Sequence, residues 1–210
     1  MLFEWVNFRF LMLGFVLTLE MALFTILISF VFGTLLGVMR FSGGRWPKLI
    51  ASLYIELVRN LPSLFFIVWA RVKSHLPPVP SVILGMVVFN SAVVAEIVRG
   101  GLVSVDTGQW EAARAQGFGF FSTMWHIVLP QALRRMIPPV VSQFITIVKD
   151  TSFTQLVGIE ELTGRGAILF GKYANALQTF FVIACIYFVV DYALALFARR
   201  LERRLATRSF

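Results

Sequence analysis

Five long apolar stretches dominate the chain, at about residues 10–39, 49–70, 82–98, 127–148 and 174–198. A helix crosses a bilayer with about 20 apolar residues, so each stretch is long enough, or nearly so, to make one crossing. Only 14% of the 210 residues are charged, against about 25% in soluble globular proteins. Too few charges remain to cover a compact, water-exposed surface. The sequence therefore predicts a single domain over residues 1–210, an all-α membrane protein with about five transmembrane helices.

The basic residues predict which way these spans run. An odd number of spans puts the two termini on opposite sides, and cytoplasmic loops carry an excess of Lys and Arg. The loops on the same side as the C-terminus hold more of the basic residues, namely Arg40, Arg45, Lys48, Arg99, Arg114, Arg199, Arg200, Arg203, Arg204 and Arg208. We therefore expect the N-terminus outside and the C-terminus in the cytoplasm. This topology accounts for the net charge of +8, so the expected partner is the lipid bilayer and no nucleic acid is expected.

The loop at about 108–130, between the third and fourth spans, has the most distinctive motif. Helix-forming residues surround Glu111, and the small side chains of Ala112 and Ala113 would let this helix press closely against a partner. Gly117 then ends the helix, and Phe118 adds aromatic surface. Two interpretations remain open on these residues alone. The helix docks on another protein, or it lies among the lipid headgroups as amphipathic segments do.

The spacing of this loop resembles the EAA loop of ABC importer permeases. Glu111-Ala-Ala is followed after three residues by Gly117, and after nine more by a segment that ends at Pro130. Other segments are similar to the polar amino acid uptake subfamily, the histidine/glutamine type. They are Arg59-Asn-Leu-Pro62, Ala95 to Gly101, Gly108-Gln109, Pro130-Gln-Ala132 and Lys149-Asp-Thr-Ser152. Asn60 and Leu61 depart from the Arg-Gly-Thr-Pro pattern of that subfamily.

The resemblance implies a type I permease of a binding-protein-dependent importer in the bacterial cytoplasmic membrane. It implies three partners, which are an ABC ATP-binding subunit dimer, a second permease subunit and an extracytoplasmic substrate-binding protein. The residues expected to couple to the ATPase are Glu111, Ala112, Ala113, Gly117, Phe118 and Pro130. The chain has no Gly-x-x-x-x-Gly-Lys-Ser/Thr phosphate loop. We therefore expect no enzymatic activity and no cofactor in this chain, with ATP and Mg bound by the partner ATPase.

Ionisable residues inside a membrane cost about 2.5–3.5 kcal/mol each on insertion scales, so each needs a reason. Glu56 and Arg59 are three residues apart in the second span and share a helix face. They could form an internal ion pair. Alternatively, Arg59 faces a central cavity and holds a substrate carboxylate with its planar guanidinium. Pro62 lies beside them and is a candidate kink.

Further polar residues allow the same two interpretations. Asn90, Ser91 and Glu96 could bond between helices, or the first two could line a cavity together with Gln143. Lys149 to Ser152 could recognise a zwitterion or cap a helix end. The candidate substrate path is therefore Arg59, Asn90, Ser91, Gln143, Lys149, Asp150, Thr151 and Ser152.

Two other classes of function are weaker. An intramembrane enzyme needs a nucleophile with a base, paired carboxylates or a His-Glu-x-x-His helix, and the sequence offers none. His75 and His126 are far apart and lack ligand neighbours, so no metal site is expected. The alternative to an importer is a passive channel, or a permease for another small zwitterionic solute. The single cysteine, Cys185, excludes an internal disulfide framework and is expected to be a small buried filler.

Overall fold

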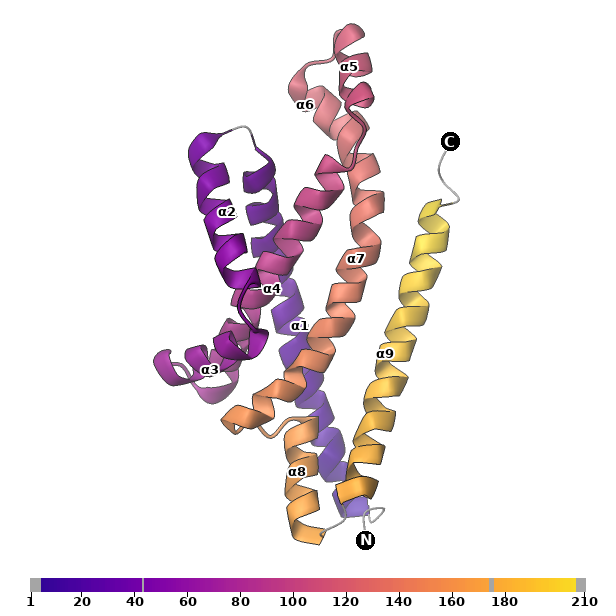
Figure 1. Ribbon diagram of the computed structural model, residues 1–210. Helices are drawn as coiled ribbons and strands as arrows, with labels where there is room; N and C mark the ends of the chain where they lie inside the picture. The colour runs from indigo at the N-terminus through magenta and orange to yellow at the C-terminus, as the bar shows by residue number, and fades with distance from the viewer. Residues whose placement is uncertain (1–4, 43, 174–175, 207–210) are drawn as a thin grey trace.

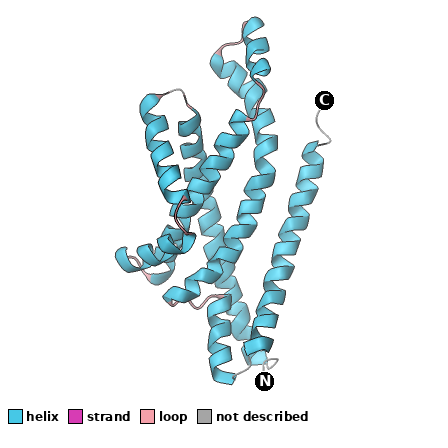
Figure 2. Ribbon diagram, in the orientation of Figure 1, coloured by secondary structure: helices cyan, strands magenta, loops and turns pink. Residues whose placement is uncertain are grey.

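Every element is helical in the computed structural model, which describes residues 5–42, 44–173 and 176–206 (Figure 2). In chain order the elements are α1 Trp5–Phe41, α2 Arg45–Arg59, α3 Ser63–Lys73, α4 Pro78–Val103, α5 Thr107–Ala115, α6 Phe120–Thr123, the π-helix η1 Met124–Val128, α7 Leu129–Asp150, the 3₁₀ helix η2 Thr151–Val157, α8 Leu162–Tyr173 and α9 Ala176–Ala206. The predicted all-α fold class is confirmed.

The long helices run between two ends of an elongated molecule (Figure 1). α1 starts at one end and runs to the other, where the turn into α2 lies. α4 returns toward that same end, which carries α5 and α6, and α7 leads away from it. α9 then runs from the end near the start of α1 toward the end that carries α5. The described termini therefore lie at opposite ends, as an odd number of passes requires.

The described helices match the predicted spans in part. The segments 7–41, 78–103 and 176–201 are long and apolar enough to cross a membrane, and α2 with α3 would make a fourth as one bent span. α7 also runs along the molecule but is more polar, so the count of five stays a prediction. Residues 174–175 of the expected fifth span, and Arg208 of the tail, lie outside the described residues.

The expected span at 49–70 is sharply bent next to the candidate kink at Pro62, because α2 and α3 meet at an angle of 99°. The side-chain amide of Asn60 donates to the carbonyl of Glu56 at 2.6 Å, and Pro62, which has no N–H, begins α3 as its N-cap. α3 then packs against α4 at Gly85, where a Cβ would lie 2.4 Å from the Phe66 carbonyl oxygen. The break and this close approach turn α3 sideways (Figure 1).

α7 continues without a break through Pro138 and Pro139, although proline inside a helix usually kinks or breaks it. The core lies where α1 crosses α4. A Cβ at Gly33 would lie 2.6 Å from Cβ of Val94, and one at Gly37 would lie 2.6 Å from the carbonyl oxygen of Ala95. Two glycines four residues apart on one helix face thus let the two backbones approach closely, as the Gly-x-x-x-Gly spacing predicts.

Two further features differ from the sequence-based expectations. Between the fourth and fifth expected spans, η2 and α8 form a helical segment that packs on α1, α7 and α9. Cys185 is exposed on α9, not buried as expected. An apolar side chain can face outward in a membrane protein because lipid, rather than water, surrounds it.

Candidate functional site: an exposed loop helix and a charged network

The loop helix α5 has well-defined caps at both ends. Asp106 precedes it and accepts a hydrogen bond from the Gly108 N–H at 2.7 Å, which satisfies one of the free donors of the first turn. After the helix, Gly117 adopts a φ of +82°, and the N–H of Phe118 donates to the Ala113 carbonyl at 3.0 Å. This is a Schellman ending, which favours glycine because other residues are strained at a positive φ.

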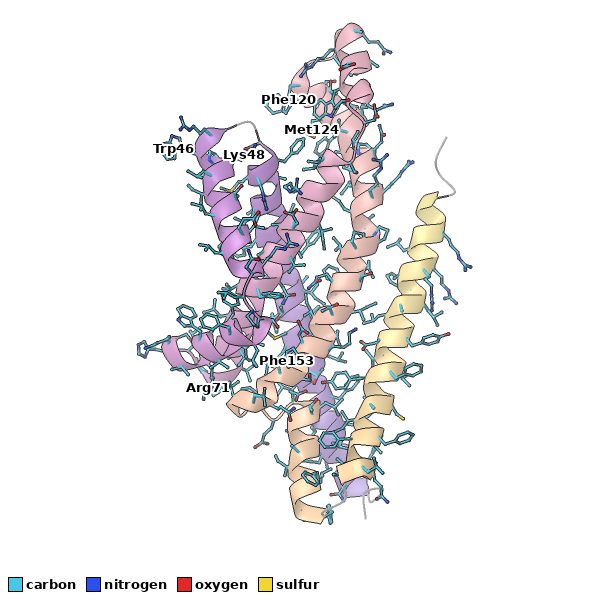
Figure 3. All side chains as sticks on the ribbon, in the orientation of Figure 1. Trp46, Lys48, Arg71, Phe120, Met124 and Phe153 are labelled. Atoms are coloured by element: carbon cyan, nitrogen blue, oxygen red, sulfur yellow. The ribbon has the colours of Figure 1, made fainter. Side chains whose placement is uncertain are left out.

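Aromatic and small residues hold α5 against the ends of α4 and α7. Trp110 stacks on Phe120 with ring centroids 5.7 Å apart, and Trp110 and Met124 pack on a buried cluster that includes Val105 and Val128. Figure 3 shows Phe120 and Met124 at this end of the molecule. Ala113 is only 2% exposed, so its small side chain serves this internal packing. The loop helix is therefore a fixed element rather than a loose connection.

The helix that follows the loop begins with a wide turn. The N–H of Leu129 donates to the Met124 carbonyl, five residues back, so residues 124–128 form a π-helix. Pro130 comes next and has no N–H to donate, which disrupts the regular ladder at this point. The side-chain amide of Gln131 donates to the Ile127 carbonyl at 3.0 Å and to Gln109 of α5 at 3.3 Å. These contacts fix α5 relative to the start of α7.

The remaining predicted coupling residues lie on the outside of the loop. Glu111, Ala112, Gly117, Phe118 and Pro130 are all exposed. Beside them is a hollow of about 400 Å³ between the end of α1 and α5, lined by Phe41, Ser42, Thr107, Trp110, Glu111, Arg114 and Phe120. This end of the molecule therefore offers an exposed, capped helix next to a concave surface.

A second polar feature is a charged network that joins α1, α2 and α4. Glu96 of α4 accepts hydrogen bonds from Arg40 at 2.9 Å and from Arg99 at 2.6 Å, and Arg40 also pairs with Glu56. An ion pair between Glu56 and Arg59, one of the two interpretations left open by the sequence, is not present among the described contacts. Glu56 is satisfied by Arg40 instead, and Arg59 lies 3.7 Å from Glu96.

Three other candidates, Asn90, Ser91 and Gln143, make bonds between helices. The Gln143 side-chain amide donates to the side-chain oxygen of Asn90 at 2.7 Å, which links α7 to α4. The Tyr54 hydroxyl donates to the Val88 carbonyl at 2.8 Å and lies 2.9 Å from the Ser91 hydroxyl, which links α2 to α4. Asn90 and Ser91 are both buried. The interhelical interpretation therefore accounts for all four side chains.

The structure separates the candidate residues into three places. Asn90 and Glu96 are six positions apart on α4, about 240° around the helix from the one to the other. Arg59 at Glu96 and Gln143 at Asn90 therefore lie on different faces of α4. Lys149 to Ser152 lie at the far end of α7, where Lys149 is exposed and Thr151 is buried with its hydroxyl donating to the Val148 carbonyl at 2.7 Å.

Sequence reasoning missed the two residues that organise most of this polar chemistry. It assigned Arg40 to a cytoplasmic turn, yet Arg40 reaches both carboxylates of the network. It also passed over Glu161, which is fully buried between α1, α8 and α9. Arg40 had no local signal, because its two carboxylate partners come from other helices. Glu161 had none, because it lies in a short polar connection.

Comparison with known proteins identifies the family to which the chain belongs. A family model described as binding-protein-dependent transport system inner membrane component matches residues 29–207. The chain belongs to this family. The resemblance to ABC importer permeases is thereby confirmed, and with it a multi-pass component of the inner membrane.

Named relatives and solved structures agree. The chain is 40% identical over 206 residues to the probable glutamine ABC transporter permease protein GlnP of Bacillus subtilis, with 94% of each chain covered. It is 33% identical to the glutamine transport system permease protein GlnP of Escherichia coli, with 83% of each covered. A crystal structure of an amino acid ABC transporter with histidines matches at a TM-score of 0.88 and 28% identity, over 93% of this chain and 94% of the other.

Proposed function

We propose that the chain is the membrane-spanning subunit of an ATP-driven importer for polar amino acids of the glutamine and glutamate class, working by alternating access. The substrate class comes from the relatives, which are named as glutamine or glutamate permeases. The observation that carries the coupling role is the exposed, doubly capped α5 beside the hollow at one end of the molecule.

The coupling step follows from how α5 is attached. Trp110 and Gln109 connect α5 to the ends of α4 and α7. A displacement of α5 would therefore move both helices. An ATP-binding subunit dimer that holds ATP and Mg would dock at Glu111, Ala112, Gly117, Phe118 and Pro130. Its closure would then shift α4 and α7 and reopen the pathway on the other side. In this proposal, α5 of this chain transmits the movement of the ATPase to α4 and α7, and the partner hydrolyses the ATP.

The same proposal sets the orientation and the remaining partners. The end that carries α5 and the last turns of α9 faces the cytoplasm, and the start of α1 faces outward, in line with the basic residues near the C-terminus. An extracytoplasmic substrate-binding protein delivers the amino acid to the outer end. A second permease subunit, identical or related, completes the pathway. Within it, Arg59 is the strongest candidate for a substrate contact, because its side chain is 43% exposed.

The coupling assignment is tested at Gly117. Replacing Gly117 by Asp puts a charged side chain on the exposed surface and strains a backbone at φ +82°, a conformation that costs about 1–2 kcal/mol for most other residues. We expect Gly117→Asp to abolish ATP-dependent uptake and to reduce co-purification of the ATPase, while the permease still inserts in the membrane.

Gly119→Asp is the matched control. Gly119 has an ordinary φ of −72° at the start of α6, and a Cβ there meets nothing within 4 Å. Aspartate is also a favoured residue at a helix start. Uptake by Gly119→Asp should stay near the wild-type rate. Wild-type uptake by Gly117→Asp would contradict the coupling role of this loop.

A further inference from the structure

The three arginines of the charged network lie at different distances from the carboxylate of Glu96. Arg40 and Arg99 both donate hydrogen bonds to Glu96, at 2.9 Å and 2.6 Å. Arg59 lies 3.7 Å from the same carboxylate, which is beyond hydrogen-bond distance. Its contact with Glu96 is therefore electrostatic only, and its donors remain available.

The network also has more positive than negative groups. Its described members are the guanidinium groups of Arg40, Arg59 and Arg99 and the carboxylates of Glu56 and Glu96. One positive charge is unmatched, and the weakest contact and the largest exposure among the arginines, 43%, both belong to Arg59. An additional carboxylate would therefore be bound most favourably at Arg59.

The face of α4 that carries Glu96 is only partly covered by the other described helices. Phe89, Val93, Glu96 and Gly100 recur on one side of the helix, and all four are half-buried. A Cβ at Gly100 would meet nothing within 4 Å among the described residues. This side of α4 is therefore partly exposed, and so is the side chain of Arg59 that contacts it at Glu96.

We propose that Glu96 is an internal competitor for the substrate carboxylate, holding Arg59 until an amino acid replaces it there. This inference rests on the proposed function and names a positioning residue for it. The α-carboxylate of the amino acid would accept two parallel hydrogen bonds from the Arg59 guanidinium, a geometry that arginine favours. Glu96 keeps Arg40 and Arg99 when Arg59 leaves, so its charge stays compensated. The exchange breaks the contact between Arg59 of α2 and Glu96 of α4. The substrate would therefore have a different affinity for conformations in which the two helices are joined and those in which they are not.

The test is direct binding of radiolabelled L-glutamine to the assembled permease–ATPase complex in lipid nanodiscs, without binding protein or ATP. Glu96→Gln removes the competing charge while keeping the size of the side chain. Because a charge pair at about 4 Å is worth about 1 kcal/mol in water and more near a protein surface, we expect the Kd of this variant to fall about fivefold. Binding of L-glutamine α-amide, which has no α-carboxylate, should be unchanged.

Glu56→Gln is the matched control, because Glu56 pairs with Arg40 and makes no described contact with Arg59. Its Kd for L-glutamine should stay within about twofold of wild type, which is well under the effect expected from the charge pair at Glu96. A Kd for Glu96→Gln that equals or exceeds that of Glu56→Gln overturns the proposal. So does a wild-type complex that binds glutamine no better than its α-amide, or that binds neither.

A second variant covers the case in which Glu96→Gln does not assemble. Arg59→Gln leaves the contacts of Glu96 with Arg40 and Arg99 in place. It should weaken glutamine binding at least about tenfold, as expected for loss of a bidentate charged pair, and leave the α-amide unaffected. An unchanged Kd for glutamine overturns the proposal. ATP-dependent uptake by the wild-type complex is measured separately, and its absence would count against the proposed function instead.

Discussion

At the scale of single residues, the clearest structural role belongs to Glu161. Its side chain is fully buried and accepts hydrogen bonds from the Thr18 hydroxyl at 3.0 Å, the Tyr187 hydroxyl at 3.0 Å and the Gly164 N–H at 2.8 Å. The last of these is a donor in the first turn of α8, where a negative charge is also favoured by the helix dipole. One carboxylate therefore ties α1, α8 and α9 together.

Thr18→Val tests this role. Valine keeps the shape of threonine but removes the hydroxyl that donates to Glu161 and accepts from the Leu162 N–H. Leaving buried polar groups without partners costs about 1–3 kcal/mol, so we expect a lower thermal midpoint for the purified complex in detergent. Thr34→Val is the control, because the Thr34 hydroxyl oxygen is buried without a hydrogen-bond partner among the described residues. Equal midpoints for the two variants would contradict the role assigned to Glu161.

The sequence predicted the residues of the coupling loop but not the contacts of the charged network, for a physical reason. The coupling motif could be found because its residues are close together in the chain, within 108–130. Arg40, Glu56 and Glu96 come from three helices, and no local spacing shows that they meet. The expected pair of Glu56 with Arg59 was plausible by spacing alone, but Arg40 from a neighbouring helix competes for the same carboxylate.

At the scale of elements, the packing of α1 on α4 depends on Gly33 and Gly37. Backbone and side-chain atoms of α4 lie closer to these glycines than a Cβ would allow. The Gly-x-x-x-Gly spacing indicates a face suited to close packing, but it does not specify the partner helix. A kink at Pro62 was likewise a candidate from the sequence, but the sequence did not specify its angle of 99°.

Gly37→Ala tests the crossing of α1 and α4. The new Cβ would lie 2.6 Å from the Ala95 carbonyl oxygen and 2.8 Å from the Val98 Cβ, so the helices must separate, at a cost of about 1–3 kcal/mol. We expect a lower thermal midpoint and less assembled complex. Gly100→Ala on the open face of α4 has free space for its Cβ and should leave the midpoint unchanged or slightly raised. A midpoint for Gly37→Ala equal to that of Gly100→Ala would argue against tight packing here.

At the scale of the whole molecule, two polar features lie apart in the fold. The capped α5 lies at one end of the molecule (Figure 1), and the charged network joins α1, α2 and α4 at Arg40, Glu56 and Glu96. α4 belongs to both, because it ends beside α5 and carries Glu96. The proposed function requires such a connection between the proposed ATPase docking helix and the proposed substrate contact.

The central claim, that the chain moves an amino acid at the expense of ATP, is tested most directly by uptake. Radiolabelled L-glutamine is measured entering liposomes that contain the complete complex, with its binding protein outside and ATP or a non-hydrolysable analogue inside. The account predicts accumulation above the external concentration with ATP and none with the analogue. Glutamine that merely equilibrates across the membrane, at the same rate with or without ATP, would contradict the account and indicate a passive channel.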